Sequence, residues 1–171
     1  LIVGIDRQWR DNWLFGVSIG HTDTDVDANG SDFESDVDAY QMGLYGSFST
    51  PTWYVDAGLS YTASDIESTR PLTALATTAH GDTDGDTMSY FLAGGYSFEV
   101  GRSWVITPNA SINYTLSDIE GYTETGAGNW VQKIKPYDTD SFITTLGVNA
   151  AFTFNSRLRG ELRAAWTHDY V

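Results

Sequence analysis

The chain has 171 residues, a formal net charge of −14 and no cysteine. Disulfides and thiolate chemistry are therefore excluded, and nucleic acid is a poor partner because little in the chain would neutralise phosphates. No signal peptide is recognisable, and no apolar run approaches the ~20 residues of a membrane-spanning helix. A transmembrane β-strand needs only ~9–11 residues of alternating polarity, so a membrane location stays open.

Apolar and polar residues alternate along almost the whole chain. In WYVDAGLSYTA (53–63) every odd position is apolar, while Asp56, Gly58, Ser60 and Thr62 stand between. Successive side chains of a strand point to opposite faces, so this stretch predicts a strand with one apolar and one polar face. The same alternation predicts eight strands, at roughly 1–9, 13–25, 36–49, 53–66, 84–100, 104–119, 139–154 and 158–171.

The connections between these segments alternate in length. Short turns are expected at 10–12, 50–52, 101–103 and 155–157, and long loops at about 26–35, 67–83 and 120–138. This is the pattern of an all-β, antiparallel, up-and-down barrel, and in outer-membrane barrels the short turns face the periplasm. Pro108 falls within a strand, where we expect a bulge or a register step to absorb its missing N–H.

The two faces favour a transmembrane β-barrel over a soluble one. The polar face is rich in Gly and Ser, whereas a soluble exterior is usually rich in Lys and Glu. Aromatic residues gather near the strand ends, as in the interfacial girdles of membrane barrels. The girdle residues are Trp9, Trp13, Trp53 and Trp104 near the short turns, and Tyr40, Tyr61, Tyr114, Trp166 and Tyr170 at the opposite ends. A soluble barrel with an aromatic core is the alternative.

Charged residues of the polar face cluster near the short turns. They are Asp6, Asp56, Glu99, Arg159, Glu161 and Arg163. Their mixed signs suggest pairing, so the first interpretation is a lumenal salt-bridge network that stiffens the barrel. The alternative is an electric field that acts on a translocating or plugging segment.

The stretch DVDANGSDFESD (25–36) is close to the spacing of a calcium-binding EF-hand loop. Flanking helices are not expected, however, and Asp36 stands where a bidentate Glu is usual. The other long loops are acidic too, for example GDTDGDT at 81–87. We therefore interpret these acidic residues as groups that keep the outward loops solvated. Weak bridging of the carboxylates by cations is the alternative.

No catalytic pattern is recognisable. His21, His80 and His168 are too few and too scattered for a metal triad, and neither a G-x-S-x-G elbow, an HExxH helix nor a phosphate loop occurs. We therefore expect a protein that is not an enzyme, without catalytic, cofactor-binding or metal-binding residues.

Taken together, the segments resemble the β-domain, or translocator, of the autotransporters of Gram-negative bacteria. The short motifs TP, GYTE and AAWTHDY are the most distinctive. The matching stretches, in the order of the family, are VGIDRQWRDNWLFGVSIGHTDTDVD (3–27), VDAYQMGLYGSF (37–48), WYVDAGLSYTASD (53–65), HGDTDGDTMSYFLAGGYSF (80–98), WVITPNASINYTLSDIEGYTETG (104–126), DSFITTLGVNAAF (140–152) and RGELRAAWTHDY (159–170).

The resemblance implies a twelve-stranded barrel in outer-membrane lipid that anchors and helps to export an N-terminal passenger domain. It also implies insertion by the barrel-assembly machinery. Only eight strands are visible, and the first resembles the middle of the family's second strand, so we expect residues 1–171 to be a β-barrel domain that is incomplete at both ends. The alternative is a small, closed, eight-stranded outer-membrane barrel with a structural or surface-binding role.

Overall fold

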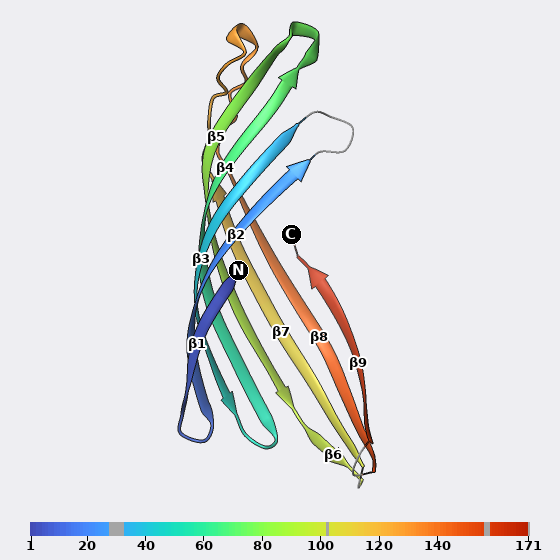
Figure 1. The fold of residues 1–171 in the computed structure, drawn as a ribbon. Coiled ribbons are helices and arrows are strands. Elements are labelled where there is room, and N and C mark those ends of the chain that lie inside the picture. Colours follow the sequence, from blue (N-terminus) through green and yellow to red (C-terminus); the bar gives the residue numbers. More distant parts are fainter. Residues whose placement is uncertain (28–32, 102, 156–157, 171) are drawn as a thin grey trace.

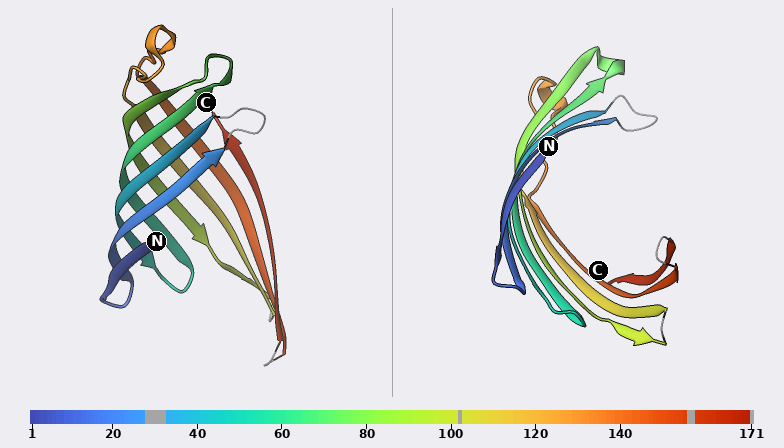
Figure 2. Two further views of the ribbon diagram at one scale, coloured as in Figure 1. Left: turned by 45° about the horizontal axis from the view of Figure 1, so that its top comes forward. Right: turned by 60° about the horizontal axis from the view of Figure 1, so that its bottom comes forward.

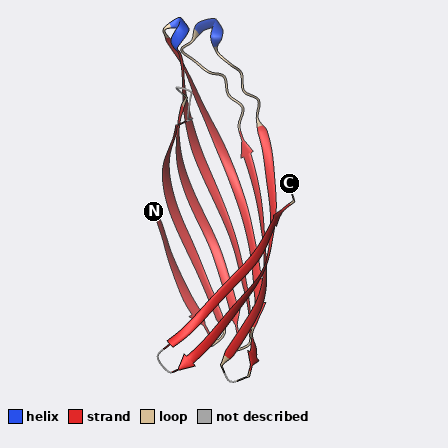
Figure 3. Cartoon of the chain, turned by 90° about the vertical axis from the view of Figure 1, so that its right-hand side faces the viewer, coloured by secondary structure: helices blue, strands red, loops and turns tan. Residues whose placement is uncertain are grey.

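The structure is a computed structural model that describes residues 1–27, 33–101, 103–155 and 158–170 (Figure 1). Two single-turn 3-10 helices, η1 (Thr73–Leu75) and η2 (Gly128–Trp130), lie at the long-loop end (Figure 3). None of the helices in the described ranges is long and apolar enough to cross a membrane. The strands are β1 (Ile2–Trp9), β2 (Trp13–Asp27), β3 (Glu34–Ser49), β4 (Trp53–Leu72), β5 (Thr77–Tyr96), β6 (Phe98–Val100), β7 (Trp104–Ile119), β8 (Tyr137–Asn155) and β9 (Leu158–Asp169).

All strands belong to one antiparallel sheet in the order β1-β2-β3-β4-β5-β7-β8-β9, with β6 continuing the line of β5 beside β7. Apart from the short β6, which continues β5, each strand pairs with its neighbour in sequence, so the predicted all-β up-and-down architecture is confirmed. The sheet is strongly curled, and its β1 and β9 edges do not meet (Figure 2). In the described ranges no residue pair joins β1 to β9, so these strands form part of a barrel wall rather than the small closed barrel.

The hairpin of β4 and β5 is longer than expected. Residues 67–83 were predicted to be a loop, but the ladder continues without interruption from Trp53↔Tyr96 to Leu72↔Thr77. The loop prediction was wrong because the Gly, Asp and Thr residues of 81–87 suggest a turn when they are considered alone. In the folded chain their backbone groups pair with β4, and part of the segment also contacts the β7–β8 loop.

The near-EF-hand stretch is also mostly strand. β2 runs to Asp27 and β3 begins at Glu34, and Asp25 lies directly opposite Asp36 in the ladder. Residues 28–32, the middle of the stretch, lie outside the described residues. Acids held on extended, paired strands do not form the tight turn of an EF-hand loop, which wraps its first ligands around one ion.

Pro108 marks the break between β5 and β6. Pairing of β5 with β7 ends at Gly95↔Asn109 and resumes as Phe98↔Ile106. Each strand advances by three residues between these two pairs, so the register does not change, and neither the expected bulge nor the expected register step is present there. Instead the ladder is interrupted opposite Pro108, which lacks the N–H that a continuous ladder would use. On its other side Pro108 remains paired with Val148 of β8.

Large apolar side chains cover the convex face of the sheet. Ile19 is 68% exposed, Leu44 58% and Leu146 57%, whereas in the described part of the chain the buried apolar residues are only Ala79 and Ala127. A water-soluble domain would bury such side chains in a core. The sheet therefore places its apolar residues toward an external apolar medium, as the strand pattern predicts for a membrane barrel.

Candidate functional site

Small hydroxyl side chains line much of the concave face. Thr87 lies 2.9 Å from Ser117, oxygen to oxygen, and Ser97 lies 2.9 Å from Thr107. These pairs join β5 or the residue after it to β7, and the residues alternate with the outward apolar ones. Hydroxyls that satisfy one another across strands leave a neutral, hydrophilic surface, as a water-filled lumen requires.

Two tyrosines lie over glycines of the neighbouring strand on this face. A Cβ built on Gly16 would lie 2.2 Å from Cζ of Tyr45, and a Cβ on Gly95 would lie 2.6 Å from the ring of Tyr54. The Tyr45 hydroxyl then donates to the Asp6 carboxylate at 3.2 Å. The missing side chains at the two glycines therefore let rings lie flat against the wall instead of projecting into the lumen.

The six charged residues predicted for the inner face do not form one network. Glu161 and Arg163 pair at 2.8 Å along β9. Asp6 and Asp56 are instead held by hydroxyls of β3, since Ser47 donates to Asp56 at 2.6 Å. Within the described residues, neither Glu99 nor Arg159 has an ion-pair partner. The role of the set as a charged lumenal ring stays a prediction.

The predicted girdle residues lie on outward positions at the two ends of the convex face. Near the short turns, Phe48 lies between Trp13 and Trp53, with ring centroids 4.7 and 4.8 Å away. At the other end, Tyr90 and Tyr114 stack at 6.4 Å. Tyr114 is half-buried. The remaining predicted girdle residues are exposed, namely Trp9, Trp104, Tyr40, Tyr61, Trp166 and Tyr170.

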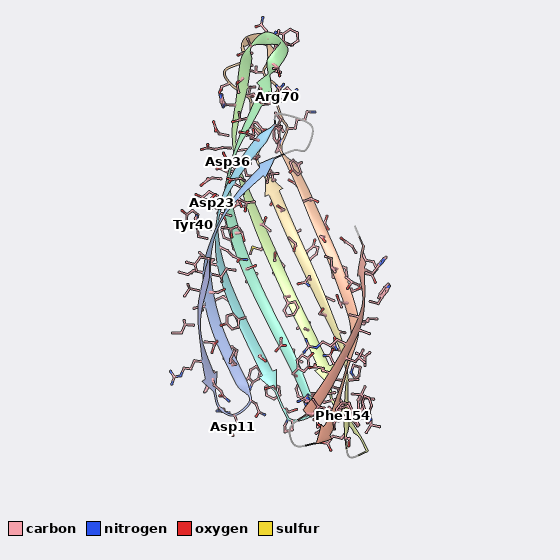
Figure 4. All side chains as sticks on the ribbon, turned by 45° about the vertical axis from the view of Figure 1, so that its right-hand side comes forward. Asp11, Asp23, Asp36, Tyr40, Arg70 and Phe154 are labelled. Carbon is pink, nitrogen blue, oxygen red and sulfur yellow. The ribbon has the colours of Figure 1, made fainter. Side chains whose placement is uncertain are left out.

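Beyond the outer aromatic belt the convex face becomes acidic. The strand register aligns Asp23, Asp38, Asp65 and Asp84 in one cross-strand row. Figure 4 shows Tyr40, Asp23 and Asp36 at successive heights on this side, with Arg70 above them and Asp11 and Phe154 at the opposite end. Like charges directly opposite one another destabilise a sheet, so this row lies where water can hydrate it.

The close carboxylates perturb one another. A hydrogen bond with Asp65, then loss of solvent and the neighbouring negative charges, raise the pKa of Asp84 above its ordinary value. A hydrogen bond with Asp138 similarly raises the pKa of Asp118. Among the described residues, no group of three or more His, Asp or Glu side chains is arranged to hold a metal ion.

The β7–β8 loop packs on the extended β4–β5 hairpin and forms a small buried centre there, the loop clamp (Ser68, Arg70, Ala79, Glu124 and Ala127). Arg70 donates to both carboxylate oxygens of Glu124, at 2.9 Å from Nε and 2.5 Å from Nη2. The backbone N–H of Gln132 donates to the same carboxylate at 2.7 Å. These bonds satisfy a carboxylate that is only 7% exposed.

The electrostatics of the clamp follow from these contacts. The Arg70 guanidinium, helped by the Gln132 N–H, holds the pKa of Glu124 below its usual range despite burial of the carboxylate. A Cβ on Gly81 would lie 2.2 Å from the Tyr122 ring, so this glycine lets the loop approach the hairpin. His80 and Thr125 exchange backbone hydrogen bonds of 3.0 and 2.7 Å, which extend the sheet into the loop.

Sequence reasoning missed the Arg70–Glu124 pair. The signal was present, because Arg70 is the one arginine that does not lie near a short-turn end and Glu124 belongs to the distinctive GYTE motif. The two residues are 54 positions apart, however, and a loop prediction over 67–83 gave Arg70 no fixed position.

A family model described as the autotransporter β-domain matches residues 1–171. The chain is similar to the esterase EstA of Pseudomonas aeruginosa, with 23% identity over 170 residues that cover 96% of this chain and 25% of EstA. It is also similar to outer membrane protein B of Rickettsia prowazekii, with 25% identity over 162 residues that cover 88% of this chain and 10% of the relative.

Solved structures show the same fold. The translocator domain of the autotransporter NalP from Neisseria meningitidis superposes with a TM-score of 0.80 at 16% identity, over 99% of this chain and 59% of that domain. The β-domain of the Bordetella autotransporter BrkA gives a TM-score of 0.73 at 20% identity, over 99% of this chain and 70% of that domain. The chain therefore spans a quarter or less of these two curated relatives and more than half of each solved β-domain.

Proposed function

The chain belongs to the autotransporter β-domain family, and we propose that it forms most of the wall of a barrel that anchors and exports a passenger domain of the same polypeptide. Proteins of this family act in type V secretion, and the β-domain lies in the outer membrane of Gram-negative bacteria. The β-domain itself is non-catalytic. Any enzymatic activity of the complete protein would lie in the passenger, as the name of the relative EstA suggests by analogy.

The observation that carries this proposal is the curled sheet whose hydrophilic face is concave and whose apolar face is convex. The sheet corresponds to 59% of the NalP translocator domain, and its β1 and β9 edges present backbone groups to further strands. Unpaired edges are strongly unfavourable in lipid, where water cannot satisfy them. We therefore propose that strands outside this chain pair with both edges and close a twelve-stranded barrel.

The inner face suits the passage of an extended polypeptide. Hydroxyl pairs such as Thr87–Ser117 and flattened rings such as Tyr45 make much of this wall hydrophilic, although Phe91 also faces it and is 40% exposed. Charged residues on this face, including Glu161 and Arg163, lie toward the periplasmic end where an exported segment would enter. The partners proposed for the complete protein are its own passenger, the barrel-assembly machinery and outer-membrane lipid.

Site-specific crosslinking in the full-length protein tests the proposed path. Ser60 and Leu59 are adjacent on β4 but point to the concave and convex faces. In cells that express a passenger stalled by a folded insert, we expect Ser60→Cys to crosslink to a cysteine in the stalled passenger and Leu59→Cys to remain uncrosslinked. Crosslinking from Leu59→Cys alone, or from neither position, would contradict passage along this inner face.

A further inference from the structure

An apolar groove crosses the convex face near the short-turn end, over strands β2, β3 and β4. It has a volume of about 360 Å³ and an almost wholly apolar lining. The aromatic residues Trp13, Phe15, Phe48 and Trp53 form its walls. All three strands are paired on both sides, although β2 is the neighbour of the open edge strand β1.

Small residues at one height make the groove. The cross-strand register aligns Phe15 with Gly46, Gly46 with Ala57, and Ala57 with Leu92. Gly46 and Ala57 therefore form a low floor between two large side chains. Without a side chain at Gly46, the Phe15 ring lies against β3, since a Cβ there would come within 3.0 Å of the ring.

A basic hollow adjoins the groove on the β1 side. It has a volume of about 520 Å³ and is lined by Arg7, Gln8, Trp9, Arg10 and Phe15, so the two hollows share the Phe15 ring. Arg7 lies opposite Phe15 in the same cross-strand row as the groove floor. Its position on the apolar convex row is unusual, because a lipid-facing arginine is costly unless its head reaches the interface.

Arg7 and Arg10 have no carboxylate partner among the described residues. The nearest acids in sequence, Asp6 and Asp11, form no ion pair with them within the described part of the chain, and Asp6 points to the concave face, where Tyr45 donates to it. Two unpaired guanidinium groups beside an apolar groove are complementary to a molecule with an anionic head and an alkyl chain.

We propose that this convex surface binds one anionic glycerophospholipid of the periplasmic leaflet, with its phosphate between Arg7 and Arg10 and one acyl chain over Gly46 and Ala57. The groove is continuous with the lipid-facing band and lies at the short-turn end, which faces the periplasm in this class of barrel. The Trp13 and Trp53 rings would then lie at the level of the headgroup, where amphipathic rings prefer to be. The proposal rests on the placement of the barrel in the outer membrane.

Native mass spectrometry of the full-length protein, purified in mild detergent, tests the proposal. The probes are palmitoyl-oleoyl phosphatidylglycerol and the zwitterionic palmitoyl-oleoyl phosphatidylcholine, added separately. We expect one phosphatidylglycerol molecule to be retained. The R7Q/R10Q double variant should retain it on the order of tenfold less well, the effect of losing one or more charge-assisted hydrogen bonds.

Filling the groove gives an independent variant. Ala57→Leu adds a branched side chain to the floor without adding polarity, and we expect it to weaken retention of both lipids. The matched controls are Ala150→Leu, an outward alanine of β8 near the same end, and Arg159→Gln, which removes a positive charge from the concave face. Both controls should bind phosphatidylglycerol as the unmodified protein does.

Several outcomes would overturn the proposal. Unchanged binding in R7Q/R10Q and in Ala57→Leu would do so, as would equal loss in the controls or equal retention of the two lipids by the unmodified protein. Equal retention of the two lipids is also the result expected if a carboxylate of a further strand beside β1 pairs with Arg7. Heat-modifiable electrophoretic mobility and surface display of the passenger distinguish these results from failure of the barrel or of the proposed secretion function.

Discussion

Tyr45 and Gly16 show how one absent side chain shapes the inner wall. The ring occupies the position that a Cβ on Gly16 would take, and its hydroxyl reaches Asp6 two strands away. Glycine weakens strands in general, but here it allows a bulky residue to pack flat and join three strands. The same arrangement recurs where Tyr54 lies over Gly95.

Substitution of Gly16 tests this packing. Gly16→Ala places a Cβ 2.2 Å from a Tyr45 ring atom, so the ring must move and release Asp6. We expect a loss of ~1–3 kcal/mol in the free energy of unfolding, as for other overpacked sites. Urea unfolding of the full-length protein in detergent micelles measures this change.

The double variant G16A/Y45A should recover part of the loss, because removing the ring restores the space. Gly58→Ala is the matched control, since its Cβ would meet its nearest neighbour at 3.6 Å, an ordinary contact. A Gly16→Ala protein as stable as the Gly58→Ala protein would refute the packing argument.

Glu124 is the second residue whose environment makes a clear prediction. Glu124→Gln keeps the size of the side chain but leaves Arg70 without its anionic partner. We expect backbone amides of 121–125 to exchange with solvent faster, on the order of tenfold, while exchange in the membrane strands stays unchanged. Hydrogen–deuterium exchange of the reconstituted full-length protein measures both regions at once.

Glu120→Gln provides the control for this change. It removes the same charge from the same loop, where Glu120 forms hydrogen bonds with Asp84 and Thr83 through its backbone. Equal acceleration in the two variants would show that loop charge in general, and not the Arg70–Glu124 pair, holds the loop in place.

Among the elements, the β4–β5 hairpin combines an acidic outer face with the loop clamp on its other face. The pKa values of Asp84 in the hairpin and of Asp118, which lies opposite Asp86 on the neighbouring strand β7, are raised, so folding favours their protonated forms. Their stabilising contribution is present at low pH and is lost as pH rises through the raised values. The pKa of Glu124 is lowered, so its contribution is present above the ordinary carboxyl range and is lost on strong acidification.

The opposite signs predict a maximum in the local stability of the hairpin. Protection of hairpin amides should rise as pH falls from 7 toward the ordinary carboxyl values of about 4, and should fall again below them. Exchange rates corrected for the intrinsic effect of pH measure this profile. Asp84→Asn combined with Asp118→Asn should flatten the rise and leave the acid-side loss, and an unchanged profile would exclude these two carboxylates as its source.

At the scale of the whole molecule, the convex face must meet lipid. Leu59 lies in the middle of this face on β4, 36% exposed. Leu59→Arg should lower the free energy of unfolding in lipid vesicles by ~2–4 kcal/mol, the effect of an arginine near the bilayer midplane. Guanidinium unfolding monitored by tryptophan fluorescence measures this loss.

The neighbouring position supplies the comparison. Ser60→Arg introduces the same charge at the same height but on the concave, hydrated side, so we expect a clearly smaller loss. If the two variants were equally destabilised, or if Leu59→Arg folded as well without lipid, the assignment of the convex face to the membrane would fail.

Much of the fold could be predicted from the sequence because the side-chain period of a strand is a local property. Stretches such as 53–63 reveal both faces of their strand without reference to any neighbour. Strand order followed from the short turns, which force adjacent antiparallel pairing. The hairpin length and the effect of Pro108 were mispredicted, since each depends on which groups of a neighbouring strand or loop are available to pair.

The sequence by itself determined that the chain is an antiparallel sheet with an apolar and a polar face, belted by aromatic residues at both ends. Only the tertiary structure decided that Arg70 meets Glu124, that acids align in rows beyond the outer belt, and that Arg7 lies level with the groove over Gly46. The physical reason is range. Alternation acts between adjacent residues, whereas ion pairs, charge rows and grooves arise from register between strands, which brings together residues such as Arg70 and Glu124, 54 positions apart.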